Sequence, residues 1–356
     1  MDSTSMKTPL TELLDLRYPI IQAPMAGVST PALAAAVSNA GGLGSVALGA
    51  LSPSAAKACL LKTMALTDRP LAANLFVHDV PTPDPQIEAR FLAELAPHFE
   101  AAGVAAPKAV HEIYRSFNED EAMLEMLLQT RPAAVSLHFG LASEKIMSEL
   151  RGAGIRVLAT ATSVVEALAV ERSGVDVLVM QSYGAGGHSG AFLGPPDPET
   201  AGRAGLIGLI RETIAAVGVP VVAAGGLMTG QDVAEVIEAG ACGAQLGTAF
   251  VPCPETLASD AYRRKLLAGT STQLTSNISG RPARGVENEL MAWANSVQSQ
   301  PPDYPRCYDA VKQLVAAKQE PEFSVMWAGE GAAAARAYPA EQMLHQLGAE
   351  LAAAAC

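Results

Sequence analysis

The segment VPVVAAGGLMTGQDVAEVIEAGACGAQLG, residues 219–247, holds two short apolar runs separated by a helical pattern. The first run, Val219–Ala224, is followed by two glycines. The second run, Gly243–Gly247, comes after Gln231–Ala239, whose spacing of apolar residues is helical. Strands that alternate with helices in this way are typical of a parallel sheet. The segment therefore predicts one strand–helix–strand unit.

The same alternation extends outward to the start of the chain and to about residue 268. Eight apolar runs have the length of a strand, and eight strand–helix units predict an α/β fold of the (β/α)₈ or TIM-barrel type. Thr30 before Pro31 and Ser52 before Pro53 are typical helix starts, because the hydroxyl caps and proline suits the first turn. The predicted strands are Pro19–Pro24, Gly42–Ala47, Leu71–Val77, Ala133–His138, Arg156–Ala161, Val175–Gln181, Val219–Ala224 and Gly243–Gly247.

Two parts of the chain depart from this repeat. Residues 78–132 form a long interval with a proline-rich start, and we expect an insertion over the barrel mouth there. Beyond about residue 269 the strand pattern stops and helical patterns with Trp293 and Trp327 follow. We therefore expect a barrel over residues 1–268 and a second, smaller, mainly helical domain over 269–356. Its Ala-rich last helix, Ala340–Ala355, would return to the barrel.

Composition excludes several classes of protein. The 356 residues are 49% hydrophobic but only 5% aromatic and 17% charged, as in a large α/β enzyme. Lys plus Arg number 24 and Asp plus Glu number 36, so the net charge of −12 disfavours nucleic acid and anionic membranes as partners. No apolar run reaches membrane-spanning length and no secretory signal opens the chain, so we expect a cytoplasmic protein. The oligomeric state, a homodimer included, is left open.

Cysteine and histidine spacing predicts no metal site. The five cysteines are widely separated, with no CxxC, and the six histidines show no ligand spacing. We expect reduced, structural thiols at Cys59, Cys242, Cys253, Cys307 and Cys356.

Polar residues within or at the end of the predicted strands mark the candidate active site, because barrels place their chemistry at the carboxyl ends of the strands. A polar ring system bound there would explain several strand amides together, whereas pairing with neighbouring backbone would explain each one alone. These residues are Gln22, Asn74, His138, Gln181 and Gln245.

Glycines follow the last two barrel strands, at Gly225–Gly226 and at Gly247 before Thr248. Bare backbone N–H groups in this position frequently hold a phosphate, which indicates a phosphate-bearing cofactor. The alternative is that the glycines only turn the chain. No GxGxxG follows the first strand, so a Rossmann-type dinucleotide site is not indicated.

The sequence GAGGHSGAF, residues 184–192, places His188 in a glycine loop just after the sixth strand. A loop of this kind lets backbone approach a flat ring, and an imidazole there can hydrogen-bond an anion or deprotonate a carbon acid. His138 has a strand-end position without the glycines, and the other histidines suggest surface or packing roles.

Tyr304, Tyr308 and Lys312 are spaced for one helix face and suit a small anionic substrate, with Tyr114 and Tyr262 available from other segments. An amphipathic packing stripe is equally compatible with this spacing. Pro305 interrupts the expected helix.

Several of these segments, in this order, resemble the class I nitronate monooxygenases, formerly called 2-nitropropane dioxygenases. The resemblance runs from about residue 17 to about 336. It implies an FMN-containing TIM barrel that oxidises alkyl nitronates with O₂ to carbonyl compounds and nitrite, with toxic propionate 3-nitronate as the implied substrate. The matching segments include PIIQAPMAGVSTPALAAAVSNAGGLGS, LAANLFVH, GAGGHSGAF, VVAAGGLMTG, GAQLGTAF and SGRPARG.

The resemblance also implies roles for individual residues. His188 matches the catalytic histidine, and Tyr114, Tyr262, Tyr304, Tyr308 and Lys312 match positions lining the substrate pocket. The positions implied to surround the flavin and its phosphate are Ala23, Pro24, Met25, Asn74, Gln181, Gly186, Gly187, Gly225, Gly226, Gln245, Gly247 and Thr248.

Two positions depart from the family, which commonly reads EAGGHRG where this chain has Gly184 and Ser189. The departure concerns the charge around the histidine. The alternative function on the same glycine framework is an FMN-dependent NAD(P)H:quinone or enoyl-thioester reductase, for which the sequence offers no recognisable nicotinamide site.

Overall fold

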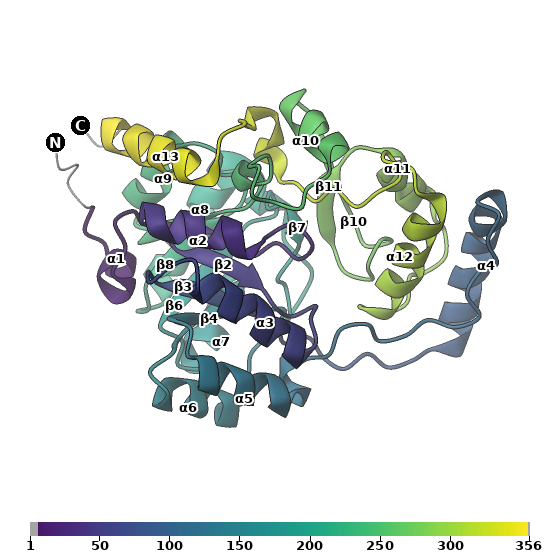
Figure 1. Ribbon diagram of the computed structural model, residues 1–356, viewed down its shortest axis with the longest axis horizontal. Coiled ribbons are helices and arrows are strands. Elements are labelled where there is room, and N and C mark those ends of the chain that lie inside the picture. The colour runs from purple at the N-terminus through teal and green to yellow at the C-terminus, as the bar shows by residue number, and fades with distance from the viewer. Residues whose placement is uncertain (1–5, 355–356) are drawn as a thin grey trace.

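The computed structural model describes residues 6–354 and contains a closed barrel of eight parallel strands (Figure 1). The strands follow in the order β1-β9-β8-β6-β5-β4-β3-β2, and a parallel bridge between Ile21 and Leu43 joins the two ends. The fold is therefore a TIM barrel, and each strand lies within its predicted run. The strands are β1 (Ile20–Gln22), β2 (Gly44–Ala47), β3 (Leu71–Phe76), β4 (Ala134–His138), β5 (Arg156–Ala161), β6 (Val177–Gln181), β8 (Val221–Ala224) and β9 (Gly243–Leu246).

Helices cover the outside of the barrel. Thr30 and Ser52 cap the second and third helices through their side-chain oxygens, as predicted. The last helix packs between α9 and α2, and so completes the ring from the far end of the chain (Figure 1). The barrel helices are α2 (Pro31–Ala40), α3 (Pro53–Met64), α5 (Glu121–Thr130), α6 (Glu144–Gly152), α7 (Val164–Arg172), α8 (Gly202–Ala216), α9 (Gly230–Glu238) and α13 (Ala340–Ala354).

Alternate strand residues divide into an inner and an outer core. The outer core joins Ile20, Val135 and their equivalents to the helices. The inner core joins Ile21 and Leu158 to Leu10 and Leu14 of α1 (Pro9–Leu14). Because α1 closes the amino-terminal end of the strands with buried leucines, the carboxyl ends remain as the face where polar side chains gather.

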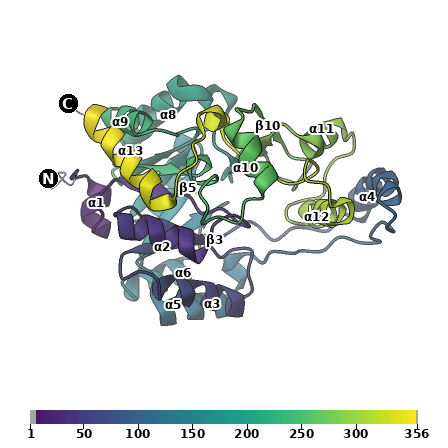
Figure 2. The same cartoon turned by 45° about the horizontal axis from the view of Figure 1, so that its top comes forward.

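A smaller lobe lies to one side of the barrel (Figure 2). Its core packs Phe91 and Phe99 against Trp293, Leu314 and Phe323. The lobe contains α4 (Pro85–Ala101), α11 (Glu289–Ser296) and α12 (Arg306–Lys318), whereas α10 (Asp260–Leu267) packs in a separate cluster with Val251 and Ala332. The short 3₁₀ turns of the chain are η1 (Phe117–Glu119), η2 (Pro198–Thr200), η3 (Thr248–Phe250) and η4 (Glu330–Ala334).

The expectation that strands stop at residue 269 is wrong. A three-stranded antiparallel sheet joins β10 (Thr272–Thr275), β11 (Ala283–Val286) and the two-residue β7 (Gly187–His188). These strands are short and polar, so they lack the apolar runs that mark a barrel strand. Their importance is that β7 carries His188, so this sheet ties the glycine loop to the smaller lobe.

The interval 78–132 contributes to both parts of the molecule. Its first helix, α4, packs against α12 of the smaller lobe, whereas its second, α5, packs beside α3 on the barrel. The strand–helix repeat of the barrel is thus interrupted over residues 78–120 and resumes with α5. No helix within residues 6–354 combines the length and hydrophobicity needed to cross a bilayer.

Candidate active site

His188 is held by its own main chain at the carboxyl end of the barrel. It pairs with Ala283 across β7 and β11, and its carbonyl oxygen accepts hydrogen bonds of 3.2 Å from both Gln181 Nε2 and His138 Nε2. Gly190 N donates to Gln181 Oε1 at 2.7 Å. Two of the polar strand ends predicted from sequence, Gln181 and His138, therefore position the loop that carries His188.

The imidazole of His188 stands among aromatic rings. Its centroid lies 5.6 Å from Tyr304, 5.8 Å from Tyr308, 5.3 Å from Trp327 and 5.8 Å from Phe139, each at a steep interplanar angle. We call these four rings, together with Tyr114, the aromatic cage.

Burial controls the protonation of His188. Loss of hydration, with added repulsion from His138 and Arg281, lowers its pKa from 6.5 to about 3. Its buried Nε2 has no hydrogen-bond partner among the described residues. A neutral imidazole with one free nitrogen is well suited to hydrogen-bond a ligand, but a pKa this low makes it a weak base.

The predicted tyrosine and lysine cluster forms, although not on one helix. Helix α12 begins at Arg306, so Tyr304 precedes it and only Tyr308 and Lys312 share its face. The helix does not extend back to Tyr304 because a residue that precedes a proline is disfavoured in the α conformation. Lys312 Nζ donates to Tyr114 Oη at 2.7 Å and lies 5.2 Å from the centroids of both Tyr114 and Tyr308. The cluster places one ammonium group at the edge of the cage.

Tyr262 is placed differently from the other predicted pocket residues. It is buried in α10 and its hydroxyl donates to the main-chain oxygen of Trp327. Its ring makes no stacking or edge contact with the cage rings among the described residues. Tyr262 therefore contacts the main chain of Trp327 and not the rings of the cage.

A second group of residues, which we call the glycine cradle, surrounds the ends of β6, β8 and β9. Gly225 and Gly226 have φ angles of +136° and +64°, and a Cβ at Gly225 would lie 2.1 Å from Ser182 Oγ. The Ser182 hydroxyl is buried and has no partner within residues 6–354. A buried hydroxyl without a partner beside glycine backbone is an arrangement that a phosphate can satisfy.

The other predicted cradle residues lie close by. Gly247 faces Ala23 and Met25, with a built Cβ 3.4 Å from Ala23 Cβ and 3.8 Å from Met25 Sδ, and Pro24 lies between these two residues in the chain. Thr248 Oγ1 accepts from Gly329 N at 3.0 Å. At Gly186 a Cβ would lie 2.5 Å from Gly329 N, so the 329–331 turn packs directly on the glycine loop, immediately before Gly187.

Some of the strand amides are paired with neighbouring groups of the protein, and one remains available for a bound ring system. Asn74 Nδ2 donates to Ser136 Oγ at 2.9 Å, and Gln22 Oε1 accepts from Ser45 N at 3.0 Å. These amides are satisfied by their neighbours. Gln245, by contrast, makes no side-chain hydrogen bond with the described residues and is partly exposed, so it alone retains its full capacity for a ligand.

The departure at Gly184 has a structural counterpart in Glu330. A Cβ at Gly184 would lie 2.5 Å from Glu330 Oε2, so this carboxylate fills the space of the missing side chain. Glu330 pairs with the buried Arg284 at 3.1 Å and accepts from Gly202 N at 2.9 Å. The negative charge absent from position 184 is thus supplied by residue 330.

Sequence reasoning missed several residues of this region. Ser182 follows Gln181 directly and Phe139 follows His138, so their strand-end positions were the available signal. His78 ends the LFVH segment and is buried against Tyr304, with ring centroids 5.1 Å apart. Arg281 lies in the SGRPARG segment, where its proximity to β7 is visible only in the fold.

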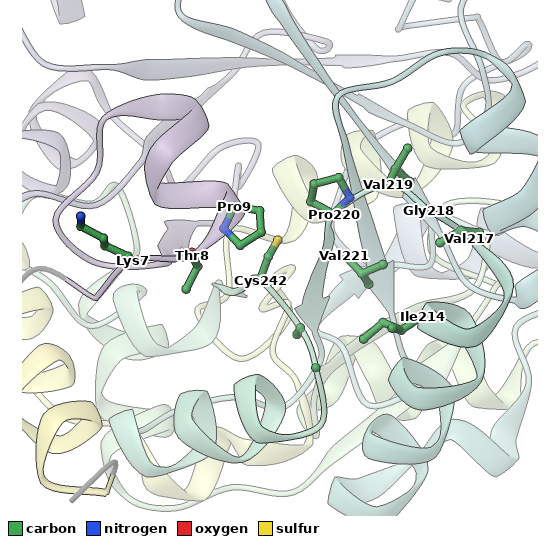
Figure 3. A pocket seen from close by; sticks show the side chains of 12 residues that line it. Lys7, Thr8, Pro9, Ile214, Val217, Gly218, Val219, Pro220, Val221 and Cys242 are labelled. Carbon is green, nitrogen blue, oxygen red and sulfur yellow. The ribbon is translucent and has the colours of Figure 1, made fainter.

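One pocket lies away from the cage and a second one borders it. One of about 310 Å³ is lined by Lys7, Pro9, Val219, Pro220 and Cys242 at the amino-terminal ends of β8 and β9, opposite the active-site face (Figure 3). The other, of about 360 Å³, is lined by the cage residue Tyr114 and by Phe76, whose ring lies beside it.

The described residues contain no cluster suited to a metal, and Cys59, Cys242, Cys253 and Cys307 are free thiols. Cys356, also expected to be reduced, lies outside the described residues.

The chain is similar to several named proteins along nearly its whole length. The family described as nitronate monooxygenase matches residues 7–350. A nitronate monooxygenase from Paraburkholderia phytofirmans is 47% identical over 99% of this chain and 97% of its own length. One from Pseudomonas aeruginosa is 45% identical over 97% and 99%.

The fold has a close counterpart among solved structures. The structure of a nitroalkane oxidase from Streptomyces ansochromogenes superposes with a TM-score of 0.87 at 36% identity, covering 98% of this chain and 99% of that one. Both the sequence and the fold comparisons thus extend over the barrel and the smaller lobe together. The chain therefore belongs to the nitronate monooxygenase family of flavin-dependent oxidoreductases.

Proposed function

We propose that this protein is an FMN-dependent monooxygenase, active in the cytoplasm, that oxidises alkyl nitronates with O₂ to carbonyl compounds and nitrite. Propionate 3-nitronate is the substrate that its charged cage suits best. The observation that carries the proposal is the free Nε2 of a neutral His188, inside a cage that also holds the Lys312 ammonium.

The cradle fits FMN better than a dinucleotide. The buried Ser182 hydroxyl without a partner, the positive φ angles of Gly225 and Gly226 and the nearby Thr248 supply a compact site for one phosphate. Gln245 retains a free amide for a polar ring edge. Ala23, Pro24, Met25, Asn74, Gln181, Gly186 and Gly187 are the remaining residues that we propose to line the flavin.

Bound flavin would supply the electron transfer that opens the reaction of a nitronate with O₂. The protein's own residues bind and orient the substrate. His188 offers its free ring nitrogen to a nitronate oxygen, while Lys312, Tyr304 and Tyr308 hold the anionic remainder. The aromatic rings exclude water, and the lobe from residue 269 on covers the substrate.

The low pKa of His188 favours nitronates over neutral nitroalkanes as substrates. A nitronate has already lost its α-proton, so it needs no base. A neutral nitroalkane must lose that proton from carbon, and an imidazole with a pKa of about 3 accepts it poorly. Any nitroalkane turnover depends on a bound substrate that raises the basicity of His188.

The test is oxygen consumption by the purified, flavin-loaded protein with propionate 3-nitronate, run beside NAD(P)H oxidation with a quinone or an enoyl thioester. We expect nitronate-dependent oxygen uptake with release of nitrite. NAD(P)H oxidation without nitronate turnover would instead support the reductase alternative. Release of FMN, and not FAD, on heat or acid treatment checks the cofactor.

The variant His188→Asn distinguishes a histidine that hydrogen-bonds the substrate from one that acts as a base. The asparagine retains a hydrogen-bonding group, so the variant should keep FMN and part of its nitronate turnover while losing nitroalkane oxidation. Unimpaired nitroalkane oxidation would remove His188 from the role of base.

A further inference from the structure

Arg281 is a second cation beside the aromatic cage, and sequence reasoning gave it no role. Its guanidinium carbon lies 4.7 Å from the centroid of Phe139 and 5.9 Å from that of Tyr304. These two rings also make edge contacts with His188, at 5.8 and 5.6 Å. Arg281 therefore lies one ring away from the proposed reacting centre.

The Arg281 guanidinium uses few of its hydrogen-bond donors within the described residues. Its side chain makes one hydrogen bond among the described residues, from Nη1 to the Ala191 carbonyl at 2.9 Å, and it forms no ion pair with them. A guanidinium has five N–H donors. Arg284, which is buried whereas Arg281 is only partly buried, bonds Tyr183 and Thr272 and pairs with Glu330. The contrast indicates that Arg281 has donors left for a ligand.

Unpaired nitrogens gather around the same tyrosine. The buried His78 ring lies 5.1 Å from Tyr304, and neither of its nitrogens makes a well-formed hydrogen bond, although the Tyr114 backbone lies near enough to oppose the fall in its pKa. His188 Nε2 is also unpaired. A cation and two incompletely bonded imidazoles around Tyr304 are the polar surroundings of a site for a small anion.

We propose that Arg281 binds the planar oxyanion of the substrate, that is, the two oxygens on nitrogen, and retains the nitrite formed from them. A guanidinium fork matches two oxygens in one plane better than an ammonium does. Lys312, on the Tyr114 and Tyr308 side of the cage, is then free for a carboxylate at the other end of the substrate. This assignment rests on the proposed nitronate oxidation.

The positive charge of this site does not titrate near neutrality. His78 and His138 have pKa values lowered to about 4 and His188 to about 3, in each case chiefly by burial and in part by the charge of Arg281. Anion binding should therefore be flat from pH 6 to 9. The other groups facing Arg281 are Asp79 after β3, Glu166 on α7, Asp303 before α12 and the Tyr304 phenol.

The probe is inorganic nitrate, a planar oxyanion that needs no turnover, titrated calorimetrically into the flavin-loaded protein. Arg281→Met should weaken nitrate binding roughly tenfold or more, since the charge-assisted hydrogen bonds of the guanidinium are lost. Arg281→Lys keeps the positive charge but loses the two-pronged guanidinium. Its affinity for nitrate should lie between that of the unmodified protein and that of Arg281→Met. Arg156→Met at the opposite end of the barrel is the matched control and should bind as the unmodified protein does.

Three results would overturn the assignment: no nitrate binding by the unmodified protein, unchanged affinity in both Arg281 variants, or binding that disappears above pH 7 as an imidazolium site would require. If Arg281→Met fails to fold, Arg281→Lys and the pH profile still decide. Oxygen consumption with propionate 3-nitronate separates the two proposals. If the protein oxidises the nitronate but binds nitrate equally well without Arg281, only the assignment of Arg281 is contradicted. If the protein does not oxidise the nitronate but its nitrate binding depends on Arg281, only the proposed nitronate oxidation is contradicted.

Discussion

The glycine cradle and the aromatic cage adjoin each other, yet they are built in opposite ways. The cradle consists of backbone at the ends of barrel strands, where Gly225 and Gly226 adopt positive φ angles. The cage consists of large side chains from separate segments, among them Tyr114, Tyr308 and Trp327. A Cβ at Gly225 would collide with Ser182 Oγ at 2.1 Å, whereas a side-chain cage tolerates reshaping, so damage to the two regions should have different consequences.

The largest expected effect comes from breaking the cradle while leaving the cage intact. Gly225→Val puts a side chain where a Cβ would lie 2.1 Å from Ser182 Oγ, at a φ of +136°. Backbone strain and overpacking each cost about 1–3 kcal/mol, so flavin affinity should fall roughly a hundredfold. Flavin absorbance of the purified variant measures this.

Gly194→Ala is the matched control for Gly225→Val, because a Cβ at Gly194 meets nothing within 4 Å. It should retain full flavin content. Equal flavin content in the two variants would show that the cradle does not hold the cofactor.

The complementary change breaks the cage and spares the cradle. Lys312→Met removes the ammonium that bonds Tyr114, so KM for propionate 3-nitronate should rise about tenfold while flavin content is unchanged. KM for an alkyl nitronate without a carboxylate should rise much less. Lys318→Met on the same helix is the control, and an equal rise for both substrates would remove Lys312 from the substrate site.

Lowering the pH should act strongly on the surroundings of the cage, because His78, His138 and His188 have the largest lowered histidine pKa values there. His78, His138 and His188 titrate below their ordinary value of 6.5 in the folded protein, so the unfolded chain binds more protons between about pH 6.5 and 3. Stability is therefore full above pH 6.5 and falls as the pH drops towards 3. The loss should be about 1 kcal/mol per pH unit for each histidine.

Urea unfolding of the protein at pH 7.5, 5.5 and 4.5 measures this loss. His78→Gln should remove about one third of the part of this slope that the three cage-side histidines contribute, since one of the three is gone. A slope that is unchanged in this variant would mean that His78 does not contribute.

The smallest effect is expected where cradle and smaller lobe meet. Gly184→Ala places a Cβ 2.5 Å from Glu330 Oε2, and this flexible carboxylate can shift only by loosening its pairing with Arg284. We expect a loss of about 1 kcal/mol in unfolding free energy. In a Glu330→Ala background the same substitution should change the unfolding free energy very little. If the losses of the two single variants simply add in the double variant, positions 184 and 330 do not interact.

The two regions also differ in how far sequence could predict them. The cradle follows from local rules, since glycines after barrel strands converge wherever the strands close into a barrel. The cage required knowledge of how distant segments pack. Tyr304 and Tyr308 were singled out by spacing, but the helix begins only at Arg306, and Tyr262 points its hydroxyl at the Trp327 backbone.

The sequence by itself determined the barrel, because eight apolar runs, their helix caps and the glycines after the last strands are local signals read one at a time. Only the tertiary structure decided the surroundings of His188. The two-residue strand β7 pairs with Ala283 about a hundred residues later in the chain, and that pairing brings Arg281 to the cage. No local pattern encodes such a contact, since it depends on burial and on side chains that meet only after the barrel and the smaller lobe have packed together.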